Sequence, residues 1–173
     1  MLPDIGGSLW HPAAGDRRLQ AVARQLADAH YSRQSVGDAQ YMPPGRRFVL
    51  VVDDLRGRAV WGVCQNRDPI GETRFRCSIF RNESDHLSSE LIRDATQATY
   101  QRWAARGWLL GAPPLRTEVD PGKVKRKRDP GRCFLRAGWT LIGCTHGAAK
   151  GRSDLLVFEA PPPDHSLTRE RPS

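Results

Sequence analysis

The stretch from Leu115 to Gly143 constrains the fold most, because strong turn signals divide it into short elements. Leu115–Val119 alternates apolar and polar side chains, which predicts a strand. Asp120-Pro121-Gly122 then predicts a turn. A basic run follows, made of Lys123 and of Lys125 to Arg128. A strand therefore leads directly into an exposed, strongly cationic loop.

A second turn signal, Asp129-Pro130-Gly131, precedes a short predicted helix. We expect Asp129 to cap this helix and Pro130 to occupy its first position. The helix is predicted over 132–137, and Gly138 should end it in the left-handed conformation that glycine adopts readily. Trp139 then begins another strand. The whole stretch predicts the order strand, basic loop, short helix, strand.

Length and charge bound the class of protein. The chain has 173 residues, enough for one domain with a sizeable core, and a formal net charge of +8 favours polyanionic partners such as nucleic acids or phosphate-bearing cofactors. It contains no C-x-x-C pair, no secretory signal and no apolar run of membrane-spanning length. We therefore expect reduced thiols, no metal site, no membrane association and a cytoplasmic location. The four cysteines are Cys64, Cys77, Cys133 and Cys144.

Hydrophobic periodicity places the remaining elements. Leu19, Val22, Ala23, Leu26 and Ala27 recur at helical spacing after a capping residue, Asp16. The predicted helices are 17–29, 88–106 and 132–137. The predicted strands are 46–53, 59–65, 74–80, 115–119, one starting at Trp139, and 155–158.

Three segments describe the domain organisation. Residues 1–16 are rich in Gly, Pro and Ala and should be irregular, although Trp10 is expected to fix them to the body. Residues 17–160 should form a single domain. Residues 161–173 are Pro-rich and charged, which predicts a disordered tail.

The order of elements predicts an α/β (α+β) fold, a mixed central sheet with helices on both faces. The helix from Ser88 connects the strand at Phe75 to the strand at Leu115. A right-handed crossover of this kind joins parallel strands, so we expect those two strands to be parallel neighbours.

The end of the Leu115–Gly143 stretch carries a resemblance. Phe134, Gly138 and Trp139 form F-x-x-x-G-W, which resembles the Y-x-x-x-G-F closing motif of GNAT acyltransferases. The resemblance implies a GNAT-like fold and an acyl donor, acetyl-CoA or a related thioester, lying between two strands that splay apart. In the family the tyrosine protonates the departing thiolate. Here the corresponding residue is Phe134, which has no proton to give.

The resemblance also implies a phosphate site at the start of the helix from Ser88, where free amides and the helix dipole attract anions. Arg81, Ser84, Ser88 and Ser89 are the candidate donor-binding residues. The glycine-rich loop of the family is absent, since no glycine occurs between Arg81 and Arg106. The alternative is that Ser88 is only a helix cap.

His30 and Tyr31 follow the first predicted helix, and a His-Tyr pair can perform proton transfer. Together with the E-L-x-R segment at Glu90 and with Asp120-Pro121, the pair resembles the Mom DNA-modification proteins of phages. Those GNAT-like proteins attach a carbamoylmethyl-type group to adenine N6 in duplex DNA. The resemblance implies that His30, Tyr31 and Asp120 are catalytic.

Each of these residues also has a structural interpretation. A His-Tyr pair at the end of a helix is often part of the core, and Asp120 before Pro-Gly is a common turn residue. The two interpretations differ in geometry. A shared site would bring His30, Tyr31 and Asp120 together, whereas structural roles would leave them apart.

The basic run predicts contact with a nucleic-acid backbone, without a pattern that reads bases. Alternatively, the basic run forms only a solvated part of the protein surface. The candidate DNA-binding residues are Lys123, Lys125, Arg126, Lys127 and Arg128.

These observations favour a GNAT-like transferase that modifies a nucleic-acid base, with DNA as its partner. Two alternatives stay open. The first is an acyl-CoA-dependent N-acetyltransferase acting on a small amine or a protein. The second is a non-catalytic nucleic-acid-binding protein that keeps the fold, as the phenylalanine at position 134 and the glycine-free loop suggest.

Overall fold

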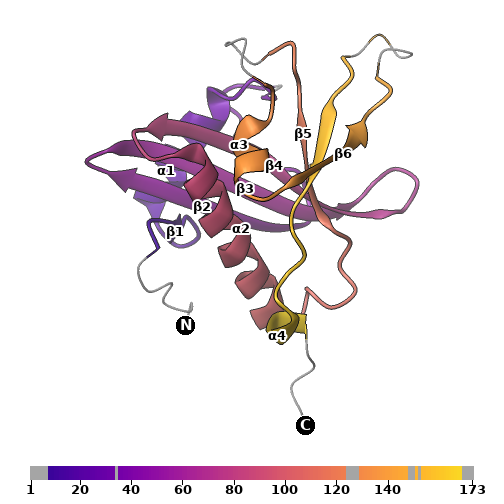
Figure 1. The fold of residues 1–173 in the computed structure, drawn as a ribbon. Coiled ribbons are helices and arrows are strands. Elements are labelled where there is room, and N and C mark those ends of the chain that lie inside the picture. Colours follow the sequence, from indigo (N-terminus) through magenta and orange to yellow (C-terminus); the bar gives the residue numbers. More distant parts are fainter. Residues whose placement is uncertain (1–7, 34, 124–128, 148–150, 152, 169–173) are drawn as a thin grey trace.

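The computed structural model describes residues 8–33, 35–123, 129–147, 151 and 153–168. Within these residues one sheet is flanked by helices (Figure 1). None of the helices described is both long and apolar enough to span a lipid bilayer. The elements are β1 (His11–Pro12), α1 (Arg17–Asp28), β2 (Arg46–Asp54), β3 (Gly57–Arg67), β4 (Thr73–Ser84), α2 (Ser88–Ala105), β5 (Leu115–Val119), α3 (Arg132–Arg136), β6 (Thr140–Cys144), β7 (Leu156–Glu159) and α4 (His165–Thr168).

The sheet has seven strands in the order β1-β2-β3-β4-β5-β7-β6. All neighbouring pairs are antiparallel except β4 and β5, which α2 connects and which pair in parallel. The predicted parallel neighbours are therefore confirmed. Helix α1 covers one face of the sheet, and α2 and α3 cover the other (Figure 1), so the mixed sheet with helices on both faces is also confirmed.

Helix α1 follows the sequence pattern closely. The Asp16 carboxylate accepts hydrogen bonds from the backbone amides of Arg18 and Leu19 at 2.8 and 3.0 Å, as an N-cap residue does. All five apolar residues predicted for its buried face are buried. They pack on Val51 and Val60 of the sheet and form a small second core on this side.

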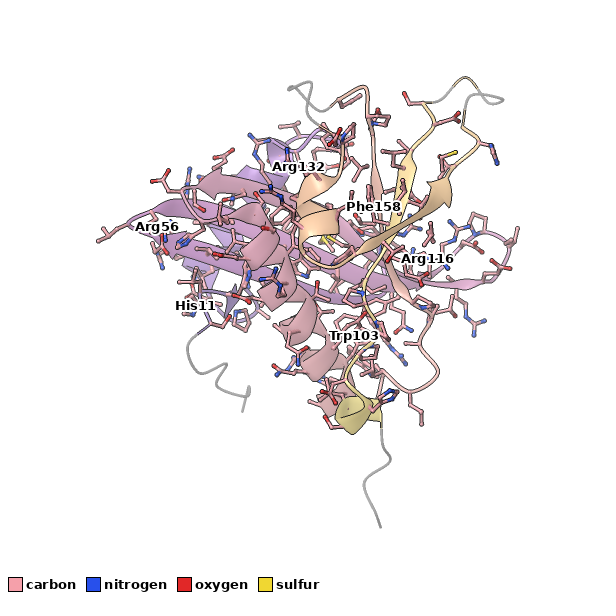
Figure 2. All side chains as sticks on the ribbon, viewed as in Figure 1. His11, Arg56, Trp103, Arg116, Arg132 and Phe158 are labelled. Carbon is pink, nitrogen blue, oxygen red and sulfur yellow. The ribbon has the colours of Figure 1, made fainter. Side chains whose placement is uncertain are left out.

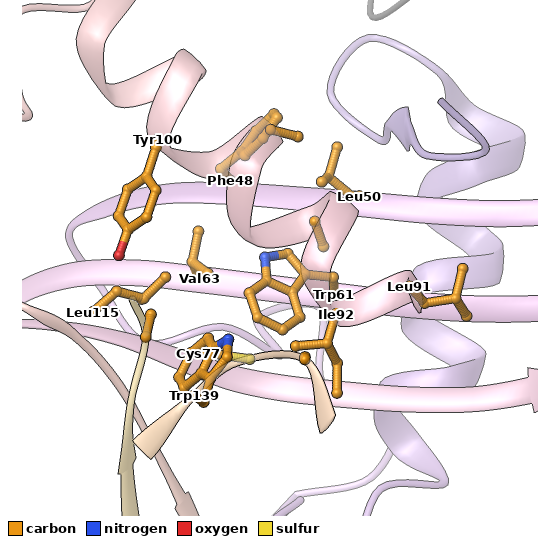
Figure 3. Close-up of a cluster of buried hydrophobic side chains, with 14 of the residues drawn as sticks. Phe48, Leu50, Trp61, Val63, Cys77, Leu91, Ile92, Tyr100, Leu115 and Trp139 are labelled. Carbon is orange, nitrogen blue, oxygen red and sulfur yellow. The ribbon is translucent and has the colours of Figure 1, made fainter. Parts of the chain in front are cut away.

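The larger core lies between the sheet and α2, and tryptophans dominate it (Figure 3). Trp61 is fully buried, and its indole N–H donates to Thr99 Oγ1 at 3.0 Å. The Trp139 indole likewise donates to Thr96 Oγ1 at 3.2 Å. Two threonines of α2 therefore satisfy the polar atoms of large buried rings, which would otherwise cost about 1 to 3 kcal/mol each.

Strand β4 continues to Ser84, which corrects the predicted strand over 74–80. Arg81, Asn82 and Glu83 continue the ladder with β3, opposite Val60, Ala59 and Arg58. Strand β3 is longer as well and begins at Gly57. The last part of β4 is only partly buried, so its side chains are polar and lack the apolar alternation that marks a strand. The sequence pattern therefore did not predict this extension.

Helix α3 begins at Arg132, as predicted, but its capping residue differs from the prediction. Gly131, with φ of 80°, is its N-cap residue, so neither Asp129 as cap nor Pro130 as first helical residue is correct. The carbonyl of Asp129 instead accepts a hydrogen bond from the Arg132 amide at 3.0 Å, which closes a turn before the helix. Gly138 ends the helix with φ of 91°, as predicted.

Both terminal segments are more ordered than expected. β1 pairs with β2, and the Trp10 indole donates to the Leu91 carbonyl at 2.9 Å, so Trp10 fixes the N-terminal segment to α2. At the other end, α4 packs Leu167 on the main core, and the Tyr100 hydroxyl donates to the Pro161 carbonyl at 2.8 Å. The prediction of disorder from 161 onward is therefore wrong for 161–168, and 169–173 lie outside the described residues.

Candidate functional site

The sheet opens between β4 and β5. Their parallel pairing covers only three residue pairs and ends at Cys77 and Thr117. Beyond this point β4 continues along β3 to Ser84, while β5 continues to Val119 along β7. Beyond Cys77 and Thr117, each strand stays paired with its other neighbour but no longer with its parallel partner. The two strands therefore diverge, and a gap opens beside the second half of β4.

A β-bulge marks the start of this gap. Gly62 of β3 pairs with Ile79, and the next residue, Val63, pairs with Cys77, so Ser78 is an extra residue in β4. Such an insertion bends a strand and reverses which face its side chains occupy. Accordingly Cys77 belongs to the core under α2, whereas Ile79 belongs to the core under α1.

A large cleft lies beside the gap, on the side of the sheet that α1 covers. It has a volume of about 1410 Å³ and is open to solvent. Cys77, Ser78 and Ile79 form part of its wall, so the cleft reaches the bulge itself. Tyr31 and Asp120 also line it.

The structure brings together Tyr31 and Asp120, which are 89 residues apart in the sequence. The Asp120 backbone amide donates a long hydrogen bond of 3.5 Å to the Tyr31 hydroxyl. Tyr31 is 39% exposed and thus reachable from the cleft, whereas Asp120 is 8% exposed. The Asp120 carboxylate accepts a hydrogen bond from the Gly122 amide at 2.9 Å, so it also makes the predicted turn.

Burial raises the pKa of the Tyr31 hydroxyl above its usual value, and the Asp120 amide opposes this only in part. Tyr31 therefore keeps its proton at neutral pH and is suited to donating it. Asp120, which also lines the cleft, supplies a carboxylate, a group that can accept a proton. The pair offers both halves of acid-base chemistry at one place.

His30 does not line the cleft and instead supports Tyr31. The two rings stack with centroids 4.4 Å apart. The backbone amide of Ser32 donates to His30 Nδ1 at 3.2 Å, so Nδ1 is an acceptor and the neutral ring carries its proton on Nε2. Burial, and secondarily the charge of Arg81, lowers the pKa of His30 to about 4. Of the three predicted catalytic residues, two meet at the gap and His30 lies against one of them.

The lowered pKa of His30 predicts a pH-dependent stability. The unfolded state binds a proton near pH 6.5 and the folded state only near pH 4, so stability falls as pH drops from about 6.5 to 4. In His30→Gln this part of the fall should disappear. Urea unfolding of both proteins between pH 7 and 4 measures it, and parallel pH curves for the two proteins would contradict the shift.

The predicted donor-binding residues at the start of α2 mostly have partners within the protein. Arg81 Nε pairs with Glu83 Oε1 at 2.6 Å, and Arg81 Nη1 donates to the Ala29 carbonyl at 2.7 Å, at the end of α1. The Ser84 hydroxyl donates to Asn82 Oδ1 at 2.6 Å, and Asn82 Nδ2 donates to the Ser88 hydroxyl at 3.0 Å. Ser89 lies in the first turn of α2 and is partly buried.

The backbone of the β4–α2 loop is also occupied. The amides of Ser84, Asp85 and His86 donate to Asn82 Oδ1, the Arg56 carbonyl and Ser84 Oγ respectively. Their acceptors are internal, so these amides cannot cradle an anion. Four carboxylates lie in or beside this loop, on Asp54, Glu83, Asp85 and Glu90. Residues 84–86 therefore offer the pyrophosphate of coenzyme A no free amide, and the nearby carboxylates oppose it.

The cationic residues that line the cleft differ in whether they have partners within the protein. Arg33 is bound to Asp28 at 2.7 Å, and Arg74 is bound to Asp68 at 2.8 Å. Arg76, by contrast, has a buried Nε without a hydrogen-bond partner. Lys123 lines the cleft and is exposed. Of the predicted DNA-binding residues, Lys125, Arg126, Lys127 and Arg128 lie outside the described residues.

Phe134 is an interior residue, 5% exposed, and its ring contacts those of Phe80, Trp139 and Phe158. It cannot replace the family's proton donor, but Tyr31 places a hydroxyl at the gap from the opposite face of the sheet. Sequence reasoning missed Ser78 and Arg76 as parts of the site. Nothing in a single sequence marks a bulge, and Arg76 looked like any outward residue of a strand.

Comparisons with known proteins identify the fold but no close relative. No family model and no curated protein matches the sequence. Among solved structures, an aminoglycoside 6'-N-acetyltransferase from Enterococcus faecium is similar, with a TM-score of 0.60 at 14% identity, covering 90% of this chain and 99% of that one. An aminoglycoside 6'-acetyltransferase type Ii has a TM-score of 0.56 at 13% identity, covering 91% and 95%. At these identities the likeness shows the fold alone, and it confirms the predicted GNAT-like α/β fold.

Proposed function

We propose, from a GNAT-type fold whose β4 and β5 part at a bulge beside Tyr31 and Asp120, that the chain is an N-acyltransferase. The acyl donor would lie in the gap and the acceptor amine would approach through the cleft. The single observation that carries the proposal is that Tyr31 and Asp120 meet in the cleft where the strands separate, through the Tyr31 hydroxyl and the Asp120 backbone amide. A merely structural Tyr31 would not need to be reachable from a cleft.

The proposed chemistry balances with these two residues. The amine nitrogen attacks the carbonyl carbon of the donor thioester, and the carboxylate of Asp120 accepts the proton that the nitrogen must lose. The C–S bond then breaks, and the Tyr31 hydroxyl protonates the departing thiolate. Proton exchange with solvent restores both residues. His30 holds the Tyr31 ring by stacking and takes no proton itself.

The donor would be recognised by its thioester arm rather than by its nucleotide, because the amides of residues 84–86 in the β4–α2 loop already have internal acceptors. We predict that kcat/KM for S-acetylpantetheine lies within about tenfold of that for acetyl-CoA. A pyrophosphate bound by several charge-assisted hydrogen bonds would make the difference far larger, at about 1.5 to 3 kcal/mol for each bond. Thiol release with both donors measures it.

The first test of the proposal is whether the protein transfers an acyl group from a donor to an amine. Purified protein is incubated with acetyl-CoA or S-acetylpantetheine and a panel of amines, and mass spectrometry detects acylated products. The panel includes aminoglycosides, because the two similar structures carry that name. Product formation that the Tyr31→Phe variant lacks supports the proposal. Hydrolysis alone, or no reaction with any amine, contradicts it.

A second candidate is an exocyclic amine of a nucleic-acid base, as in the Mom-like hypothesis. The observation that favours it is that Arg76 and Lys123 of the cleft have no carboxylate partner among the described residues, although Asp38, Glu118 and Asp120 line the same cleft. The cationic run from Lys125 follows directly in the sequence. A phosphate backbone would be attracted by these cations.

The two acceptors are separated by one experiment. Nucleosides are prepared from the DNA of cells that express the protein or its Asp120→Asn variant, and mass spectrometry searches for a modified base. A modified nucleoside found only with the unsubstituted protein supports the base as acceptor. Duplex binding without modification, and without acylation of any amine, would support the non-catalytic alternative.

A further inference from the structure

Charge is distributed unevenly along the sheet. One end, where β2 and β3 meet in their hairpin and where α2 begins, carries the carboxylates of Asp53, Asp54, Glu83 and Asp85. The opposite end, where β2, β4 and β5 begin, is rich in arginine. Figure 2 shows Arg56 at the first end and Arg116 at the second. The exposed arginines at the second end are Arg46, Arg47, Arg67, Arg74, Arg106 and Arg116.

Three arginines at this end are held over aromatic rings. The guanidinium carbon of Arg46 lies 4.9 Å from the centre of the Trp108 ring, and that of Arg106 lies 5.5 Å from it. Arg102 lies 5.7 Å from the centre of the Phe48 ring. The rings are themselves rigid, since Trp108 packs edge-on against the buried Trp103 at 5.6 Å. We call Arg46, Arg102, Arg106 and Trp108 the arginine–tryptophan surface.

The positive charge of this surface is not neutralised within the protein. In the part of the chain that the structure describes, no carboxylate is within ion-pair distance of Arg46, Arg102 or Arg106. Arg46 Nη1 donates only to the neutral amide oxygen of Gln65, at 3.3 Å. Partial burial, and then the nearby charge of Arg106, lowers the pKa of Arg102. Grouping like charges in this way opposes folding, unless an anion is bound there.

We propose that the arginine–tryptophan surface binds the phosphate backbone of a nucleic acid. Guanidinium groups bind phosphate oxygens in pairs, and stacking on aromatic rings fixes their orientation beforehand, so little side-chain entropy is lost on binding. Among the neighbouring exposed arginines, Arg47 and Arg67 extend the cationic surface, whereas Arg74 and Arg116 pair with Asp68 and Glu159. An anionic membrane fits less well, because Ile70 and Leu110 are exposed as separate side chains and do not form an apolar face.

This surface lies close to the cleft without being part of it. Pro43 lines the cleft, and Arg46 is three residues further along, within about 11 Å of extended chain. The proposal concerns binding alone, so it rests on neither the donor nor the transfer reaction, and it stands if the second acceptor hypothesis fails.

The test compares two triple variants of equal net charge. Arg46→Gln, Arg102→Gln and Arg106→Gln remove the surface, whereas Arg17→Gln, Arg18→Gln and Arg56→Gln remove three arginines at the opposite end. Binding of a short duplex DNA is measured against salt concentration by fluorescence anisotropy. The first variant should lower the log–log salt slope by about 2 to 3, near 0.9 per lost phosphate contact, and the control should leave the slope unchanged.

A third variant protects the test against misfolding. Arg106→Glu changes one exposed residue, and it should weaken duplex binding while circular dichroism stays that of the unsubstituted protein. Vesicles containing phosphatidylserine serve as the alternative anionic partner. Equal salt slopes for the two triple variants would overturn the proposal, as would vesicle binding that depends on these arginines while duplex binding does not.

Discussion

Tyr31→Phe and Asp120→Asn should each lower kcat for acyl transfer by about 10² to 10⁴ while the melting temperature stays within a few degrees. Tyr31→Phe removes one oxygen and keeps the ring that stacks on His30. Asp120→Asn removes the charge but keeps an oxygen that can accept the hydrogen bond from the Gly122 amide. Each change therefore removes one proton-transfer group and preserves the local structure. Steady-state kinetics on the amine accepted best measures the effect.

Tyr100→Phe is the matched control for the loss of a tyrosine hydroxyl. Tyr100 lies in α2, away from the cleft, and its hydroxyl donates to the Pro161 carbonyl at 2.8 Å. Its loss should lower stability by about 1 kcal/mol and leave kcat unchanged. The opposite pattern, with Tyr31→Phe destabilising the fold and sparing the rate, would assign Tyr31 a structural role and remove the acid from the proposed reaction.

Most of the fold could be predicted because it depends on local patterns. The helix after Asp16 has an N-cap residue and five apolar residues at helical spacing, and each behaves as predicted. The parallel pairing of β4 and β5 follows from a strand-helix-strand order and from the handedness of crossovers. Gly138 ends α3 because the left-handed conformation there favours glycine. None of these features requires knowledge of a distant part of the chain.

The site could be predicted only in part, because tertiary contacts create it. His30, Tyr31 and Asp120 were proposed from a resemblance, but a sequence does not show that Tyr31 reaches the gap while His30 stays outside the cleft. The bulge at Ser78 arises from the pairing of β4 with β3. The donor loop depends on Asn82, whose side chain forms hydrogen bonds with three neighbours, Ser84, His86 and Ser88. Asn82 belongs to no sequence motif, so the sequence did not mark it as part of the site.

Two glycines at the ends of α3 give the second large expected effect. Gly131 and Gly138 have nearly the same backbone conformation, with φ of 80° and 91°. Any other residue there is strained by about 1 to 2 kcal/mol. The surroundings differ completely. A Cβ on Gly138 would meet nothing within 4 Å, whereas a Cβ on Gly131 would overlap ring carbons of Phe158.

Phe158 cannot easily move aside. It is fully buried, stacks on Phe134, and belongs to β7, where it lies opposite Thr117 of β5 (Figure 2 labels Phe158 beside α3). Gly131→Ala should therefore add an overpacking cost of about 1 to 3 kcal/mol to the backbone strain. Gly138→Ala should show the strain alone. Urea denaturation of the two variants measures the difference between them.

Activity should distinguish the two glycines as well. Thr117 forms the last pair of the β4–β5 ladder, so a displaced Phe158 would shift β5 at the point where the gap begins. We expect Gly131→Ala to lose transfer activity below its unfolding transition and Gly138→Ala to keep it. Equal loss of stability in both variants would mean that Phe158 gives way freely, and the gap would then be a more adaptable site than the packing around it indicates.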